Sequence, residues 1–177
     1  MSKFILLAAL IGLFLSVNYV FPGDAPADSR LLFHIERSTN ANKAYYYLSA
    51  DSAGTIDRKS PVNAFWIMWA KDSTGRTREP LTPFEKKMAY GYAVKSDTSG
   101  KFAYVMRLSA FPDRPIGLRV HAGVAVAEIA IEGHPARLEK IYVEAEKGRV
   151  IPKVKYVELF GTALDTRQKV SEKVFPR

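Results

Sequence analysis

From Arg30 onward, short runs in which apolar and polar residues alternate are separated by turn-forming residues at a regular spacing. Alternation with a period of two is the pattern of a half-buried β-strand, and clusters of Gly, Asn, Asp and Ser mark turns. The runs lie at residues 31–37, 44–48, 63–70, 92–95, 102–108, 116–122, 124–131, 138–145, 150–160 and 169–174. About nine or ten strands with one short helix predict an all-β domain, an antiparallel β-sandwich or barrel. The pattern does not separate these two architectures.

The run at residues 63–70 is apolar on both of its sides and contains both tryptophans of the chain, Trp66 and Trp69. A strand without a polar side must be covered on both faces. We therefore expect this strand in the middle of the fold.

One short helix is predicted after residue 81. Thr82 fits the N-cap, Pro83 the first helical position, and Glu85 the third position of a capping box. Gly91 fits the stop signal at the end of the helix. Phe84 and Met88 lie four residues apart, so we expect them to pack this helix onto the sheet.

Prolines mark two further places in the predicted sheet. Neither Pro112 nor Pro115 has an N–H to donate to a ladder, so residues 111–115 are expected to break the sheet. Pro152 predicts an edge or a bulge near the start of its strand. The last run, residues 169–174, is expected to pair back across the turn at residues 165–166.

The first residues have the layout of a secretory signal peptide: a basic start with Lys3, then an apolar run from Phe4 to Val17. Small residues at Ala25 and Ala27 predict cleavage before Asp28, which leaves a single β-rich domain over residues 28–177. The alternative is an uncleaved anchor over residues 4–21, at the short end for a bilayer span. We expect an exported protein, periplasmic or extracellular, with no membrane span after cleavage.

Charge and composition exclude several classes of function. Lys and Arg outnumber Asp and Glu by 26 to 18, a net charge of +8, but the basic residues are scattered, so no nucleic-acid partner is expected. The chain has no cysteine, so it has neither disulfides nor a cysteine-ligated metal. No phosphate-binding loop, dinucleotide fingerprint or serine nucleophile elbow occurs, and no cofactor is expected.

His34 and Glu36 are the main candidates for chemistry, because alternation places both on one face of their strand. They could form an acid/base pair or hold a metal with His121 or His134, or they could simply bond to each other on a polar face. Arg37 falls on the other face. Glu128 and Glu132 are expected to form a solvated rim.

Several longer stretches can be compared with known families. They are residues 33–38 (FHIERS) with Asn40 and Asn42, Pro61-Val62 leading to Trp66, Leu81-Thr82 with Glu85, residues 89–92 (AYGY) and residues 152–161 (PKVKYVELFG). Together they resemble an exported bacterial family known only as a domain of unknown function. The resemblance implies no activity or ligand. It implies that His34, Glu36, Arg37 and Glu85 belong to a recurring set of polar positions.

The first hypothesis is an exported domain that binds a small amphipathic ligand or an envelope partner in an aromatic-lined cleft. Its candidate residues are His34, Glu36, Arg37, Trp66, Glu85 and Tyr90. The second is a metal-assisted or acid/base hydrolase that uses His34 and Glu36, which requires a further polar group converging on that pair. A structural envelope protein is the third.

Overall fold

The computed structural model describes residues 30–51, 55–146 and 153–176, which form eleven strands and one helix. The strands are β1 (Leu31–Arg37), β2 (Asn40–Leu48), β3 (Val62–Ile67), β4 (Arg78–Pro80), β5 (Tyr92–Ser96), β6 (Tyr104–Leu108), β7 (Phe111–His121), β8 (Val124–Ile131), β9 (His134–Ala145), β10 (Val154–Ala163) and β11 (Lys169–Val174). The helix is α1 (Pro83–Met88). An all-β domain with one short helix is thus confirmed. The strand that the pattern did not predict is β4, which has only three residues and ends in a proline.

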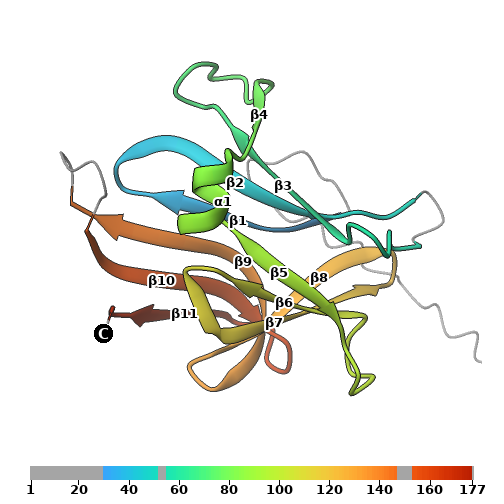
Figure 1. Ribbon diagram of the computed structural model, residues 1–177. Helices are drawn as coiled ribbons and strands as arrows, with labels where there is room; N and C mark the ends of the chain where they lie inside the picture. Colours follow the sequence, from blue (N-terminus) through green and yellow to red (C-terminus); the bar gives the residue numbers. More distant parts are fainter. Residues whose placement is uncertain (1–29, 52–54, 147–152, 177) are drawn as a thin grey trace, which may run out of the picture.

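The sheet forks at β9 (Figure 1). One edge of β9 pairs with β10, while its other edge pairs first with β8, at residues 134–137, and then with β1, at residues 140–143. Two wings therefore leave β9, the first wing made of β1, β2, β3 and β4, and the second wing made of β8, β7, β6 and β5. Because β1 runs parallel to β9, the sheet is mixed rather than purely antiparallel.

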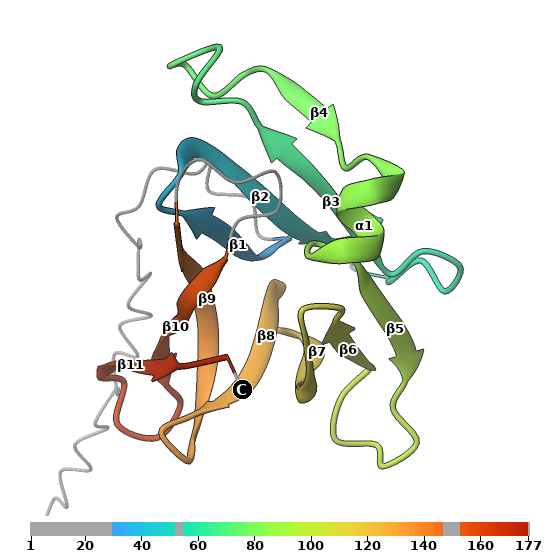
Figure 2. The ribbon, with the colours of Figure 1, turned by 60° about the vertical axis from the view of Figure 1, so that its left-hand side comes forward.

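The wings curl towards each other as a half-barrel, and α1 lies across their open side, opposite β9 and β10 (Figure 2). The core fills the space between the wings. The ring of Tyr46, in the first wing, stacks on the Phe33 ring with 4.7 Å between ring centres. It also contacts the Tyr92 ring of the second wing edge-to-face, with 5.8 Å between ring centres. The Tyr92 hydroxyl donates a hydrogen bond of 2.9 Å to the Val62 carbonyl. Tyrosines therefore join the two wings.

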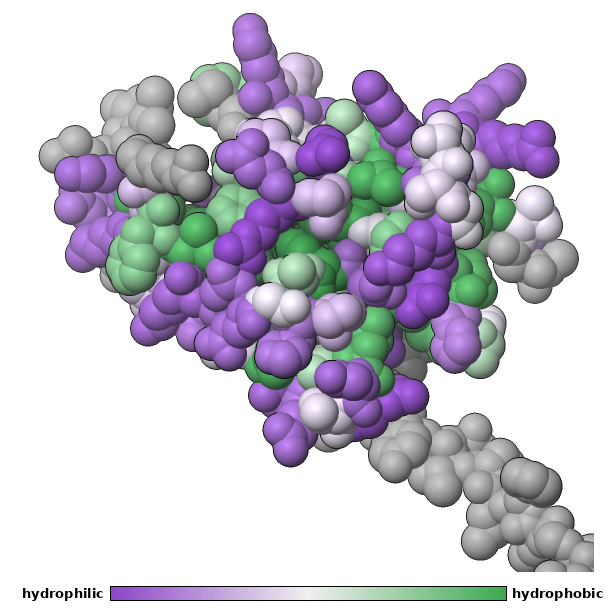
Figure 3. All heavy atoms as spheres, turned by 90° about the horizontal axis from the view of Figure 1, so that it is seen from below, coloured by the Kyte–Doolittle hydropathy of each residue, from purple (hydrophilic) through white to green (hydrophobic). Residues whose placement is uncertain are grey.

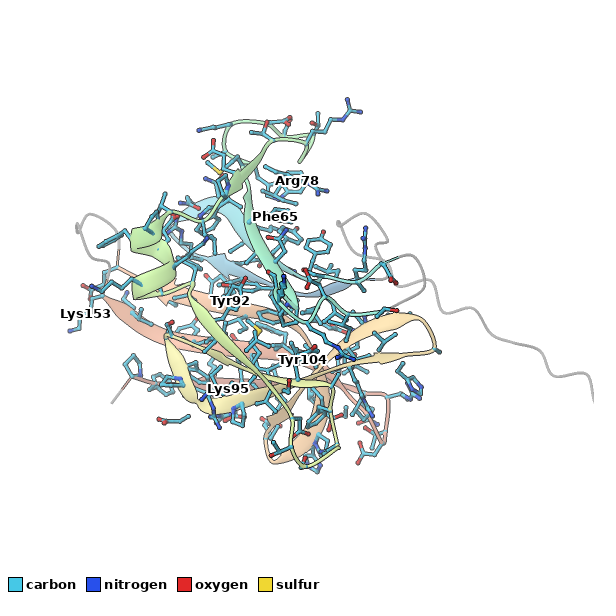
Figure 4. All side chains as sticks on the ribbon, turned by 45° about the vertical axis from the view of Figure 1, so that its right-hand side comes forward. Phe65, Arg78, Tyr92, Lys95, Tyr104 and Lys153 are labelled. Atoms are coloured by element: carbon cyan, nitrogen blue, oxygen red, sulfur yellow. The ribbon has the colours of Figure 1, made fainter. Side chains whose placement is uncertain are left out.

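The prediction that the tryptophan strand lies in the middle of the fold is wrong, because β3 is next to the edge of the first wing. It is apolar on both faces because a separate hydrophobic cluster covers each. Trp66 belongs to the core, whereas Ile67 packs with Tyr45 and Tyr47 on the outer face. At the edge of this outer cluster, the Arg78 guanidinium lies 4.9 Å from the centre of the Phe65 ring (Figure 4).

The prolines of β7 interrupt pairing without ending the strand, which corrects the expectation of a break. On the side of β6, β7 is paired at Ile116 and again at Phe111, with a register shift between them. On the side of β8, pairing ends at Gly117. The intervening prolines thus fall where no ladder bond is required of them. Pro152 lies outside the described residues.

The capping box of α1 is confirmed, with Thr82 as N-cap and Glu85 as its partner. The C-cap is Ala89, two residues before the predicted glycine. Phe84 does not pack on the sheet, since 64% of it is exposed, and the side chain of Met88 lies outside the described part of the structure. Within the described ranges, no helix has the length and hydropathy of a membrane span.

Candidate functional site

The six residues predicted for one site lie on the two opposite faces of the first wing. His34 and Glu36 are on the outer face of β1, because alternation directs Phe33 and Ile35 into the core. Arg37 points to the inner face, where it meets Trp66 and Tyr90. The single aromatic cleft expected from the sequence is therefore two separate clusters. We call them the histidine cluster (His34, Glu36, Lys43 and Lys140) and the arginine cluster (Arg37, Trp66, Glu85 and Tyr90).

The arginine cluster is built around two aromatic rings. The Arg37 guanidinium lies 5.0 Å from the centre of the Trp66 ring and 5.8 Å from that of Tyr90. The two rings meet edge-to-face at 4.8 Å. A guanidinium over an indole face is a favourable cation–π arrangement. Trp66 and Tyr90 are at most 9% exposed, so they form a rigid support for the cation.

Glu85 connects this cluster to α1. Its Oε1 accepts a hydrogen bond of 3.0 Å from the Trp66 indole, and its Oε2 accepts one of 2.8 Å from the Thr82 backbone. Burial would raise the pKa of Glu85, but these hydrogen bonds and the nearby charge of Arg37 outweigh burial and lower the pKa. Glu85 is therefore ionised at neutral pH.

Arg37 has an incomplete set of partners. Its side chain is half-buried, and its Nε–H is buried without a hydrogen-bond partner in the described structure. No described carboxylate forms an ion pair with it. The nearest charge that acts on Arg37 is the ionised Glu85, whose pKa Arg37 helps to lower, so the cation is compensated at a distance rather than by a direct ion pair. A guanidinium presents its donors in one plane, which suits carboxylates and phosphates.

The histidine cluster is satisfied by its own members. His34 Nε2 lies 3.1 Å from Glu36 Oε1, and the Lys43 and Lys140 ammonium groups lie 2.8 and 3.4 Å from the same carboxylate. The His34 ring also stacks on Tyr45 at 5.1 Å. Burial would raise the pKa of Glu36, but hydrogen bonds from Lys43 and His34 outweigh it and lower the pKa to about 2. Burial lowers the pKa of His34 below its usual 6.5, more than Glu36 raises it.

The other two candidate histidines lie away from this pair. His121 ends β7, which β9 and β8 separate from β1 in the sheet. His134 is paired at the start of β9, six residues before the Lys140 that faces His34, which corresponds to about 20 Å along a strand. Glu85 lies on the inner face with the arginine cluster. Across the described ranges, no three His, Asp or Glu residues form a group that could hold a metal ion. The groups that converge on Glu36 are lysines, which neutralise it.

The structure also contains a candidate site that the sequence did not predict. It is a hollow of about 700 Å³ on the outer face of the second wing. Glu128 lines it and is only 6% exposed, so the prediction of a solvated rim at this residue is wrong. The sequence did indicate this burial, because Glu128 stands between apolar residues. The rest of its strand, β8, is buried at nearly all positions. None of the six predicted site residues lines this hollow.

A model of a domain of unknown function, DUF4833, matches residues 33–173, well over half of the chain. This chain belongs to the DUF4833 family. The resemblance to a family of unknown function is thereby confirmed, and the matched region of this DUF4833 protein contains both clusters and the hollow. No curated protein and no solved structure matches the chain.

Proposed function

We propose that this DUF4833 domain binds a small amphipathic ligand through the arginine cluster, with the acidic head group of the ligand at Arg37. The observation that carries the proposal is the half-buried Arg37, which lies on two rings and forms no direct ion pair with a described carboxylate, although ionised Glu85 is near enough to sense its charge. An anionic group would accept charge-assisted hydrogen bonds from the half-buried guanidinium.

The neighbours of Arg37 restrict the charge of the ligand. Glu85 is ionised and close enough to affect the electrostatics of Arg37 and Tyr90. A second negative charge on the ligand would be repelled by Glu85. The cluster therefore suits a singly charged head group, such as a carboxylate or a phosphodiester, better than a doubly charged phosphate.

The apolar part of the ligand has a surface to contact on α1. Phe84 is 64% exposed and directly precedes Glu85 in the helix. Phe84 is a large exposed aromatic side chain on the helix that carries Glu85, and it offers the apolar contact that an amphipathic molecule needs in addition to the Arg37 cation. Lys86 and Lys87, both exposed in the last turn of α1, add positive charge near this surface.

Fluorescence titration with dodecanoate tests the proposal in a Trp69→Phe background, where Trp66 is the only tryptophan and is excited selectively. We expect a saturable change in emission that Arg37→Met weakens about tenfold, as loss of a charge-assisted hydrogen bond predicts. Arg58→Met removes the same charge from an exposed loop and should leave the affinity unchanged. Equal affinity of the Arg37→Met and parent proteins would refute the proposal.

We also propose that the protein is exported and that residues 1–27 are removed, as their signal-peptide layout predicts. This segment lies outside the described residues. Support comes from the position of β1, which begins at Leu31, so that cleavage before Asp28 leaves every described strand intact. Expression of the full chain in a bacterium, followed by fractionation and N-terminal sequencing, tests this. A start at Asp28 in the exported fraction is expected, whereas the full chain in the membrane fraction would support the anchor.

A further inference from the structure

The hollow on the second wing lies away from the arginine cluster, on the outer rather than the inner face of the sheet. Gly117 of β7 and Glu128 of β8 pair with each other and form part of its floor, while Ile116 and Leu118 on either side of Gly117 point into the core. Its volume of about 700 Å³ falls in the range of small-molecule sites. Hydrophobic and hydrophilic side chains are intermixed on the surface seen from below (Figure 3).

A buried carboxylate lies at the centre of the polar lining. Glu128 Oε1 is 3.0 Å from the Lys101 ammonium, and its Oε2 is 3.0 Å from Nη2 of Arg119. The Glu128 side chain is 7% exposed, whereas that of Lys101 is 62% exposed. The Nε–H of Arg119 is buried without a partner in the described structure. The carboxylate is thus fixed in direction and retains lone pairs that two cations do not fill.

Two sets of hydrogen bonds fix the walls of the hollow. On one side, Asp97 accepts hydrogen bonds from Ser99 and Phe102 and folds its loop over β7, so that the Phe102 ring packs against Gly117. A β-carbon at Gly117 would overlap that ring, so only glycine allows the packing. On the other side, the Arg114 guanidinium forms a two-bonded pair with Glu172 of β11. The hollow is therefore built in advance of any ligand.

The charges of the hollow balance. With Arg119 included, the cations and carboxylates are equal in number: Lys101, Arg107, Arg114 and Arg119 against Asp97, Asp113, Glu128 and Glu172. A ligand with a net charge gains nothing from a balanced lining, and a lipid tail would desolvate these groups at a cost. A zwitterion would have to displace the pairs that already exist.

We infer that this hollow binds a neutral saccharide. A hydroxyl group both donates and accepts, so it can bond to a carboxylate and to its paired cation without breaking the pair. The apolar part of the lining offers surface for the C–H face of a sugar ring: Val105, Pro115 and Pro135. The inference is independent of the arginine cluster, because no residue belongs to both sites.

Calorimetric titration of the mature domain with chitotriose, cellotriose and maltotriose tests the inference. At least one trisaccharide should bind, and Lys101→Gln and Glu128→Gln should each weaken its binding about tenfold. Lys101 is exposed, so its variant remains informative even where Glu128→Gln fails to fold. Asp165→Asn, in the exposed turn after β10, is the matched control, and Arg37→Met should retain full saccharide affinity.

Three results would overturn the inference. The first is a lack of binding by all three trisaccharides at about 10 mM, roughly ten times the dissociation constant of a weak complex of about 1 mM. The second is equal binding by the Lys101→Gln and parent proteins. The third is displacement of a bound trisaccharide by the zwitterion glycylglycine, which would show that the hollow recognises paired charge.

Discussion

The Trp66 indole donates its hydrogen bond to Glu85, the same carboxylate that closes the capping box of α1. One side chain therefore starts the helix and fastens it to β3. A helix of six residues does not hold its conformation alone, so this bond fixes where the chain crosses from the first wing to the second.

Glu85→Ala should destabilise the domain more than Thr82→Ala. Both changes remove the capping box, which is worth about 1 kcal/mol, but only Glu85→Ala also leaves the buried Trp66 indole without its acceptor, for a total of about 2 kcal/mol or more. Urea unfolding of the two variants and the parent measures the difference. Equal losses would mean that the Trp66 bond adds no stability.

Gly91→Ala should be among the most damaging substitutions in the chain. A β-carbon there would overlap the carbonyl oxygen of Lys86, which is backbone and cannot turn away. We expect a loss of about 3 kcal/mol or more, as for other overpacked sites. Gly100→Ala is the control: its φ of +76° disfavours alanine by only about 1 kcal/mol, and its surroundings are open. Similar unfolding free energies for the two variants would contradict this reading of Gly91.

Local rules predicted the elements well and their partners poorly. Alternation located most strands, and Thr82-Pro83-Phe84-Glu85 located the helix start, because these signals depend on near neighbours. The fork at β9 could not be foreseen, since which strand pairs with residues 140–143 is decided by contacts across the whole chain.

The candidate site was predicted in part for the same reason. Alternation correctly separated Arg37 from His34 and Glu36, yet the sequence carried no measure of what lay on each face, and the three were assigned to one cleft. The burial of Glu128 depends on Lys101 and Arg119, which come from a loop and another strand.

The histidine cluster should make the free energy of unfolding depend on pH in the acidic range. The pKa of Glu36 is about 2 in the folded state against 4.5 ordinarily, so its contribution is complete above pH 4.5 and is lost as the pH falls towards 2. Lys43→Met removes the strongest attractive partner and should flatten the fall in unfolding free energy over that window. Urea unfolding at a series of pH values measures the slope, and an unchanged slope would show that Lys43 does not hold the carboxylate ionised.

His34 should act over a higher range of pH. Burial lowers its pKa in the folded state below 6.5, so the unfolded chain takes up this proton first, and stability falls as the pH drops below 6.5. An NMR titration of the His34 ring should give a midpoint below that of the same residue in urea. His34→Gln should remove this part of the pH dependence. A folded midpoint at or above 6.5 would mean that Glu36 outweighs burial.

The tyrosine contacts between the two wings can be used to test whether the fold positions the arginine cluster. The Tyr46 hydroxyl donates a hydrogen bond of 2.9 Å to the carbonyl of Tyr90, and Tyr46 is fully buried. Tyr46→Phe removes this donor where water cannot replace it, so we expect a loss of about 1–3 kcal/mol in unfolding free energy. Tyr92→Phe is the matched change, because it removes the bond to Val62 from a half-buried position and should cost less.

Since Tyr90 supports Arg37, Tyr46→Phe should also weaken dodecanoate binding, whereas Tyr92→Phe should not. If both variants bind dodecanoate like the parent, the carbonyl bond does not position the Tyr90 ring, and Trp66 alone supports Arg37.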